Sequence, residues 1–180
     1  MDERENARGV DWWLDAATVA VAAVVERYQQ PLGGYLFHLV GDLELALSVT
    51  QETFIRCREA LAADDGVRLA LYRVATELAL ARTPDSGAVS HALRRLPWSE
   101  SGQSGVALEL KSAQRGLAQA ALRDLPPGER AVLLLSDLEL FPVSQVAAIL
   151  GLSPEEAYDR LEQARARFRY AFVEACRAQR

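Results

Sequence analysis

A short motif near the carboxyl end constrains the fold of this chain more than any other feature. Residues 144–150 (SQVAAIL) have the composition of a short helix, and Gly151 is a residue type that readily takes the left-handed backbone of a helix end. The next segment, Ser153-Pro154-Glu155-Glu156, offers an N-cap, a proline at the first helical position and early carboxylates. Two helices that meet at a glycine predict a helix-turn-helix motif within residues 125–169.

Composition bounds the class of protein. Half of the 180 residues are hydrophobic, which is enough for one medium domain or two small ones. No apolar run approaches the roughly 18 residues of a membrane span, and the charged start MDERENARG does not resemble a signal peptide. Cys57 and Cys176 lie far apart without metal-ligand spacing, so we expect no metal and no cofactor, in a reducing cytoplasm.

The charge balance limits what the chain can do alone. The formal net charge is −5, and Lys111 is the single lysine among 20 basic residues. Proteins that bind DNA on their own usually carry a strongly basic face, which releases counterions from the phosphates. If this chain binds nucleic acid, we expect a partner to supply much of the electrostatic attraction.

The first 83 residues have helical spacing throughout. The first amphipathic stripe runs along Ala17, Val21, Val24, Val25 and Tyr28. Pro31 is expected to interrupt this helix and to open a second one, which Gly41 closes. Asp42 can cap a third helix, and a fourth covers residues 67–82. On the third helix the expected inward face consists of Leu43, Ala46, Leu47, Thr50 and Phe54, and on the fourth of Leu71, Val74, Ala75 and Leu78.

The middle of the chain changes in character. Residues 84–112 are rich in Pro, Gly and Ser, with an apolar patch around Trp98, and they predict an interdomain linker. Helical spacing resumes at residue 113. The sequence therefore predicts an all-α protein of two small helical domains, residues 1–83 and 113–180, joined by a flexible linker, the second domain containing the helix-turn-helix.

Two segments together resemble the extracytoplasmic-function class of bacterial RNA polymerase sigma factors. The segment VVERYQQPLGGYLFHLVGDLELALSVTQETFIRCREAL is similar to that family's region two, including its Gln51-Glu52-Thr53-Phe54. LRDLPPGERAVLLLSDLELFPVSQVAAILGLSPEEAYDRLEQARARFR is similar to region four, which reads the promoter's −35 element. The resemblance implies two partners: the clamp helices of the RNA polymerase core and promoter DNA, the DNA bound weakly without the polymerase. An anti-sigma factor is a further possible partner.

The resemblance also implies site residues. The polymerase-binding candidates are Asp42, Gln51, Glu52 and Phe54. For Gln51 and Glu52 the alternative is an ordinary solvated face, and for Phe54 it is core packing. The candidates for DNA binding are Arg68, Tyr72, Arg73 and Arg82 near the −10 element, and Ser153, Tyr158, Arg160, Gln163, Arg165 and Arg167 near the −35 element. No catalytic residue is expected.

The chain departs from the family pattern on its DNA-facing sides. Ala70 stands where the family usually has tryptophan, and Glu77 where it has asparagine. In the second helix of the motif, Ala157, Leu161, Ala164 and Phe168 form the buried stripe. The opposite face then carries Glu155, Asp159 and Glu162, which are unfavourable next to phosphates.

Three functions remain open on these grounds. The first is a working sigma factor whose promoter affinity comes largely from the polymerase. The second is a degenerate sigma-like protein that keeps the fold and its protein partners but has lost promoter reading. The third, an enzyme, has little support because the chain has only His38 and His91 as histidines and lacks a nucleophile motif.

Overall fold

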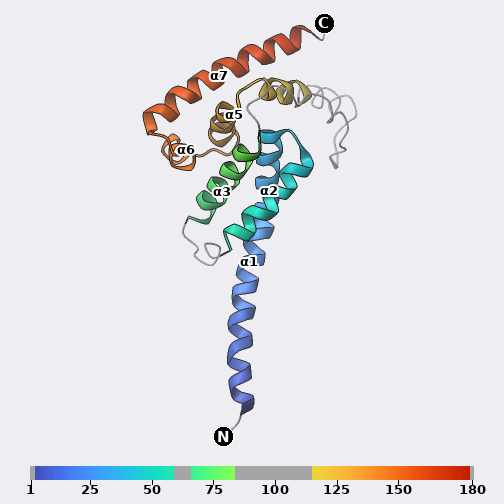
Figure 1. Cartoon of the computed structure of the whole chain (residues 1–180), viewed down its shortest axis with the longest axis vertical. Helices are drawn as coiled ribbons and strands as arrows, with labels where there is room; N and C mark the ends of the chain where they lie inside the picture. The colour runs from blue at the N-terminus through green and yellow to red at the C-terminus, as the bar shows by residue number, and fades with distance from the viewer. Residues whose placement is uncertain (1–2, 59–65, 84–114, 179–180) are drawn as a thin grey trace.

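The computed structural model describes residues 3–58, 66–83 and 115–178, with side chains from residue 21 onward. Within these ranges the chain is all-α, as predicted (Figure 1). The predicted linker, Trp98 and Lys111 lie outside the described residues. The elements are α1 (Glu3–Val40), α2 (Leu43–Arg56), α3 (Val67–Arg82), a helix over residues 115–123, α5 (Pro127–Leu133), a π-helical turn η2 (Leu134–Leu138), α6 (Val143–Leu150) and α7 (Pro154–Arg177).

The expected break at Pro31 is wrong, because α1 runs through it as one helix. Pro31 is exposed, so the carbonyl that loses its helical partner there can be hydrated. The apolar positions on either side of Pro31 stay in phase: Tyr28 packs against the core, and Leu32, Tyr35, Leu36 and Leu39 are buried. Gly41 then ends the helix with φ 75°, as predicted.

The cap of α2 is confirmed, but its buried face is rotated from the expected one. The Asp42 carboxylate accepts a hydrogen bond from the Leu45 amide at 2.7 Å. Leu47 was expected inside and is instead 51% exposed. The side chains that α2 buries are Ala46, Val49, Thr50 and Thr53. The two threonine hydroxyls donate to carbonyls one turn back, at 2.7 Å each, which lets them enter the core with their hydrogen bonds satisfied.

Helix α3 packs against both α1 and α2. Its Leu71, Ala75 and Leu78 are buried as expected. The Tyr35 hydroxyl lies 2.7 Å from the Thr76 hydroxyl, so the largest buried side chain of α1 also satisfies its polar atom in this interface. The three helices form the first helical group.

The second group contains the predicted helix-turn-helix. Gly151 ends α6 in the left-handed conformation, with φ 66° and ψ 33°. Ser153 and Glu156 form a reciprocal capping box at the start of α7. The stripe of Ala157, Leu161 and Ala164 is buried, and Phe168 packs beside it, as predicted.

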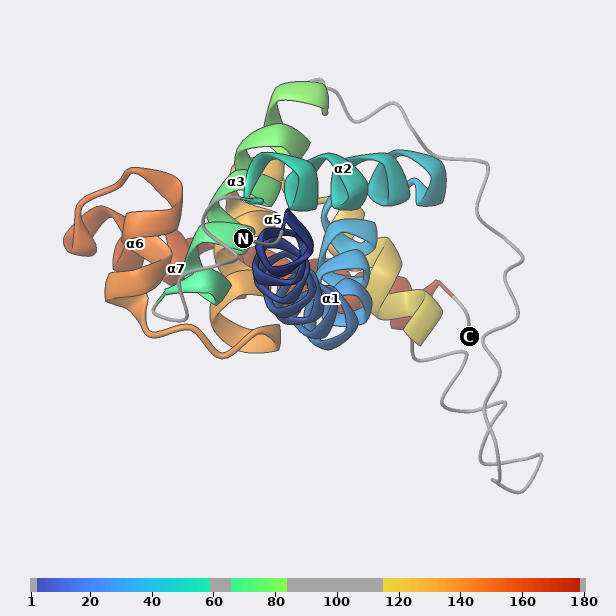
Figure 2. The ribbon, with the colours of Figure 1, turned by 90° about the horizontal axis from the view of Figure 1, so that it is seen from below.

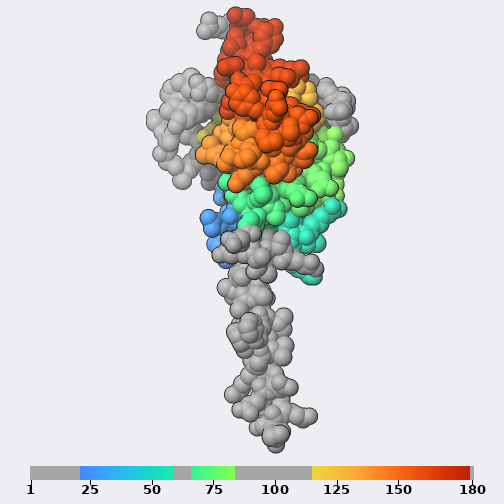
Figure 3. Space-filling view, turned by 90° about the vertical axis from the view of Figure 1, so that its left-hand side faces the viewer, coloured from blue at the N-terminus to red at the C-terminus, as the bar shows by residue number. Residues whose placement is uncertain are grey.

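The two helical groups share one hydrophobic core. Helix α3 packs along α6, and α1 contacts α5 and η2 (Figure 2). On the surface, α6 adjoins both α3 and α7 (Figure 3). Buried side chains of α1 and α3 belong to the same cluster as Leu135, Phe141 and Val146. No helix in the described ranges is long and apolar enough to cross a membrane.

Candidate nucleic-acid and polymerase interfaces

The outer face of α7 mixes both charges. Tyr158 is 57% exposed, and Arg160 and Gln163 are also exposed. The acids Glu155, Asp159 and Glu162 are exposed on the same helix. All of these side chains are accessible to a ligand, although a phosphate approaching Arg160 would also approach carboxylates.

Two other arginines of α7 are already engaged by acids. Arg165 donates to the Asp137 carboxylate at 2.6 and 3.1 Å and to Glu162 at 2.9 Å. These hydrogen bonds raise the pKa of the Arg165 guanidinium, and the bond to Asp137 has a larger effect than the bond to Glu162. Arg167 pairs with Glu129 at 2.8 Å. The pairs with Asp137 and Glu129 tie α7 to η2 and α5, and all three pairs offset positive charge on α7.

Ser153 has a structural role at the start of α7. Its hydroxyl accepts from the Glu156 amide at 3.2 Å, and the Glu156 carboxylate accepts from the Ser153 amide at 2.9 Å. The bonds from Ser153 hold the pKa of Glu156 below its usual range.

On α3, two candidate DNA-binding residues contact the second helical group: Tyr72 is buried there, whereas the Arg68 side chain stays 41% exposed. The Arg68 guanidinium carbon lies 4.0 Å from the centre of the Phe141 ring and 5.6 Å from that of Tyr72. Arg68 donates to the Glu139 carbonyl, and the Tyr72 hydroxyl donates to the Glu139 carboxylate. Tyr72 is 1% exposed. The pKa of the Tyr72 hydroxyl is raised mainly by burial and also by the hydrogen bond to Glu139. In this arrangement Tyr72 is not accessible to a base.

The other two candidates on α3 are exposed. Arg73 points to solvent, whereas Arg82 pairs with Glu52 of α2. Glu52 also pairs with Arg56 at 2.7 Å. The hydrogen bond from Arg82 and, to a smaller extent, the charge of Arg56 lower the pKa of the Glu52 carboxyl. One candidate for polymerase binding thus neutralises one candidate for DNA binding.

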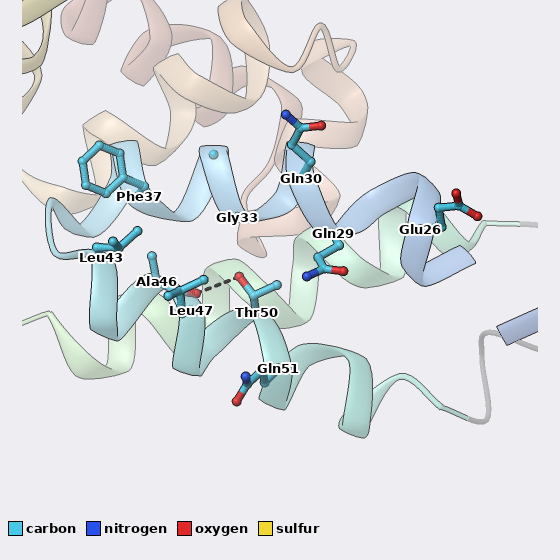
Figure 4. A pocket seen from close by; sticks show the side chains of 11 residues that line it. Glu26, Gln29, Gln30, Gly33, Phe37, Leu43, Ala46, Leu47, Thr50 and Gln51 are labelled. Carbon is cyan, nitrogen blue, oxygen red and sulfur yellow. Dashed lines mark hydrogen bonds between the residues drawn. The ribbon is translucent and has the colours of Figure 1, made fainter. Parts of the chain in front are cut away.

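The polymerase candidates lie along α2. Asp42 caps the helix, Phe54 is partly buried against the core, and Gln51 is exposed. Gln51 borders a groove of 380 Å³ between α1 and α2. Leu47 and Thr50 line the α2 side of this groove, and Gln29 and Gly33 line the α1 side (Figure 4). The alternative expected for Phe54, core packing, fits its position.

Sequence reasoning missed three residues that hold the two groups together. Arg130 is 6% exposed and donates to the carbonyl oxygens of Leu122, Arg123 and Leu125, and also to that of Leu39 at the end of α1. Glu139 and Phe141 form the contact with α3. The one available signal was Arg130, a charge at the edge of the apolar run AVLLL. No group of His, Cys, Asp or Glu in the described residues could hold a metal ion.

Comparisons with known proteins agree with this architecture. Residues 115–168 match the family described as sigma-70, region 4. Among solved structures, that of CnrH in complex with the cytosolic domain of CnrY is similar, with a TM-score of 0.59 and 21% identity over 88% of this chain and 95% of that chain. No curated protein matches the sequence significantly. Residues 115–168 therefore resemble sigma-70 region 4, and the chain as a whole shares the fold of CnrH.

Proposed function

We propose that this sigma-factor-like protein binds RNA polymerase core and directs it to promoters. The observation that carries the proposal is the sigma-70 region 4 match, which falls on a helix-turn-helix whose cap geometry is complete. The mechanism involves no bond chemistry. Specificity would come from α7 in the major groove and α3 at the −10 strand, while the polymerase supplies most of the affinity for DNA.

We assign a separate binding role to each of the three segments that the sequence predicts. Residues 1–83 would dock on the polymerase clamp through Asp42, Gln51, Glu52 and Phe54, residues 84–112 would link, and residues 113–180 would meet the −35 duplex. The exposed Arg160, Gln163 and Tyr158 are the accessible candidates on α7. Arg165 and Arg167 would have to exchange their carboxylate partners for phosphates.

A regulatory partner is also proposed. CnrH is described in complex with the cytosolic domain of CnrY, and this chain shares its fold. We therefore propose that a protein of the anti-sigma kind binds this chain.

The test is transcription with purified core polymerase and a library of promoter fragments, read by mapping transcript starts. We expect start sites that depend on this protein and that weaken when Arg160 is replaced by glutamate. Arg58→Glu, which makes the same charge change at an exposed position after α2, serves as the control. Equal loss in both variants would contradict a role for α7.

The degenerate reading keeps one observation in its favour, the exposed acids of α7 beside its paired arginines. It predicts that the protein binds core polymerase in a pull-down but that no start site depends on it. Transcripts from defined starts would reject this alternative.

A further inference from the structure

The exposed acids of α7 differ in how the fold uses them. Glu155 and Glu156 lie in the first turn, where the positive end of the helix dipole stabilises carboxylates, and Glu156 also closes the capping box. Glu162 accepts from Arg165 at 2.9 Å. Asp159 lies beyond the first turn and is exposed, and none of the hydrogen bonds and ion pairs in the described parts of the chain involves its carboxylate. The oxygens of Asp159 are therefore available to a ligand.

Asp159 lies on the side of α7 that is opposite to the hydrophobic core. Successive residues of a helix are turned by about 100°, so Asp159 stands about 200° from both Ala157 and Leu161, two positions away on either side. Both of those side chains are buried. Helix α7 packs on α5 and α6 at the edge of the molecule (Figure 1). In a helix-turn-helix, the outward residues near the start of the second helix are the ones that contact base edges.

The chemistry of a carboxylate limits which base it can recognise. An ionised carboxylate accepts hydrogen bonds and donates none. In the major groove guanine presents two acceptors, thymine an acceptor and a methyl group, and adenine an acceptor beside its amino group. Cytosine presents its N4 amino group, a donor. A carboxylate at a base edge therefore matches cytosine and is repelled by the acceptors of guanine.

We propose that Asp159 determines the sequence specificity of α7 by accepting a hydrogen bond from the N4 amino group of a cytosine in the −35 element. The inference rests on the proposed function, because it names the base that α7 recognises once the polymerase has brought it to a promoter. Repulsion between Asp159 and the phosphates lowers the affinity for every sequence, and the bond to cytosine offsets that loss in the matching sequence alone. Asp159 thus adds discrimination rather than affinity.

The first test uses the complex of this protein with core polymerase and promoter fragments randomised across the −35 region. Sequencing of the bound fragments should show one base pair at which C·G is preferred over G·C by about tenfold, a typical effect of one mismatched pair. Asp159→Arg should change the preference at that same pair to G·C, because a guanidinium donates to guanine O6 and N7. A variant that had lost its fold would not acquire a new preference.

The matched control for this test is Glu162→Gln, which also removes a negative charge from the exposed side of α7. Loss of a negative charge favours DNA of every sequence, so the readout is the preferred base and not the overall affinity. Glu162→Gln should keep the preference for C·G. A change to G·C in both variants would contradict a specific role for Asp159.

The hydrogen bond itself can be tested from the side of the DNA. Replacing the selected cytosine with 2-pyrimidinone removes the N4 amino group and should weaken binding of the wild-type complex about tenfold. The complex of Asp159→Ala, which lacks the acceptor, should be weakened less than about twofold, because the two changes remove the same interaction. Competition binding measures both ratios. Equal weakening of the two complexes would overturn the inference.

The failure of this inference can be told apart from the failure of the proposed function. If fragments are selected and transcripts start at defined sites, but no base pair responds to Asp159→Arg, promoter recognition stands and Asp159 is not a reader of bases. If the complex with core polymerase selects no fragment, both proposals are overturned.

Discussion

Arg130 joins the two helical groups through backbone oxygens rather than through a carboxylate. Its guanidinium donates to the Leu39 carbonyl at 2.6 Å and to three carbonyls near the end of the preceding helix. Carbonyls at helix ends lack intrahelical partners and carry the negative end of the helix dipole, so a cation is favourable there. Burial lowers the pKa of Arg130, yet a guanidinium stays charged at physiological pH.

Replacing Arg130 with methionine keeps much of its length but removes the guanidinium that donates to these carbonyls. We expect the free energy of unfolding to fall by roughly 3 kcal/mol, since hydrogen bonds to charged groups contribute more than neutral ones. Urea denaturation followed by circular dichroism measures the change. Arg73→Met, at an exposed position on α3, should stay within about 0.5 kcal/mol. Equal effects of the two substitutions would contradict this role.

At Leu140 we expect a substitution that raises the free energy of unfolding. A left-handed backbone costs a non-glycine residue roughly 1–2 kcal/mol, and glycine adopts it freely. Part of that gain is lost because glycine makes the unfolded chain more flexible. Leu140→Gly should therefore raise the free energy of unfolding by up to about 1 kcal/mol. The same substitution at Leu138, which is 50% exposed inside η2, should lower the free energy of unfolding. Urea denaturation of the two variants and the wild-type protein measures both changes.

At the scale of the element, the features that fix the fold of α7 are separate from the mixed charges on its outer face. The capping box and the buried stripe fix its position, and both are independent of the charges on its outer face. Asp159 is exposed there beside Arg160. The charges on the outer face of α7 can therefore be changed without changing its fold.

Asp159→Lys should strengthen binding of the polymerase complex to promoter DNA. If the new ammonium neutralises one phosphate, the slope of log affinity against log salt should become steeper by about 0.9. Glu44→Lys makes the same charge change on α2 and should leave the slope unchanged. Identical salt dependence for both variants in filter binding would mean that this face of α7 does not meet DNA.

At the scale of the whole molecule, the shared core should make unfolding cooperative. Leu36 and Leu71 of the first group belong to the same buried cluster as Leu135 and Val146 of the second. Unfolding one group alone would expose apolar surface of the other. We expect a single thermal transition whose calorimetric and van't Hoff enthalpies agree. Two separated transitions would show that the groups do not share this core in solution.

The sequence predicted best where the determining contacts are local. Gly151 and Ser153 act on residues within one turn, and the stripe of α7 follows from helical period alone. Local reasoning failed at Pro31, because the apolar face on both sides of it stays in phase and packs on one core. It failed at Leu47 because α2 has apolar residues on more than one face, and packing against α1 and α3 determines which face is buried.

What the sequence alone determined is the all-helical chain, its helix-turn-helix and the exposed acids of α7, since each depends on spacing and on the chemistry of neighbouring residues. The tertiary structure decided which candidate residues are accessible. Tyr72 is buried against Glu139 and Phe141, about seventy residues further along, and Arg68 contacts the same two residues. Arg130 donates to a carbonyl 91 residues away. Such pairs carry no local signal, because their energy arises only when two helical groups bury a surface together.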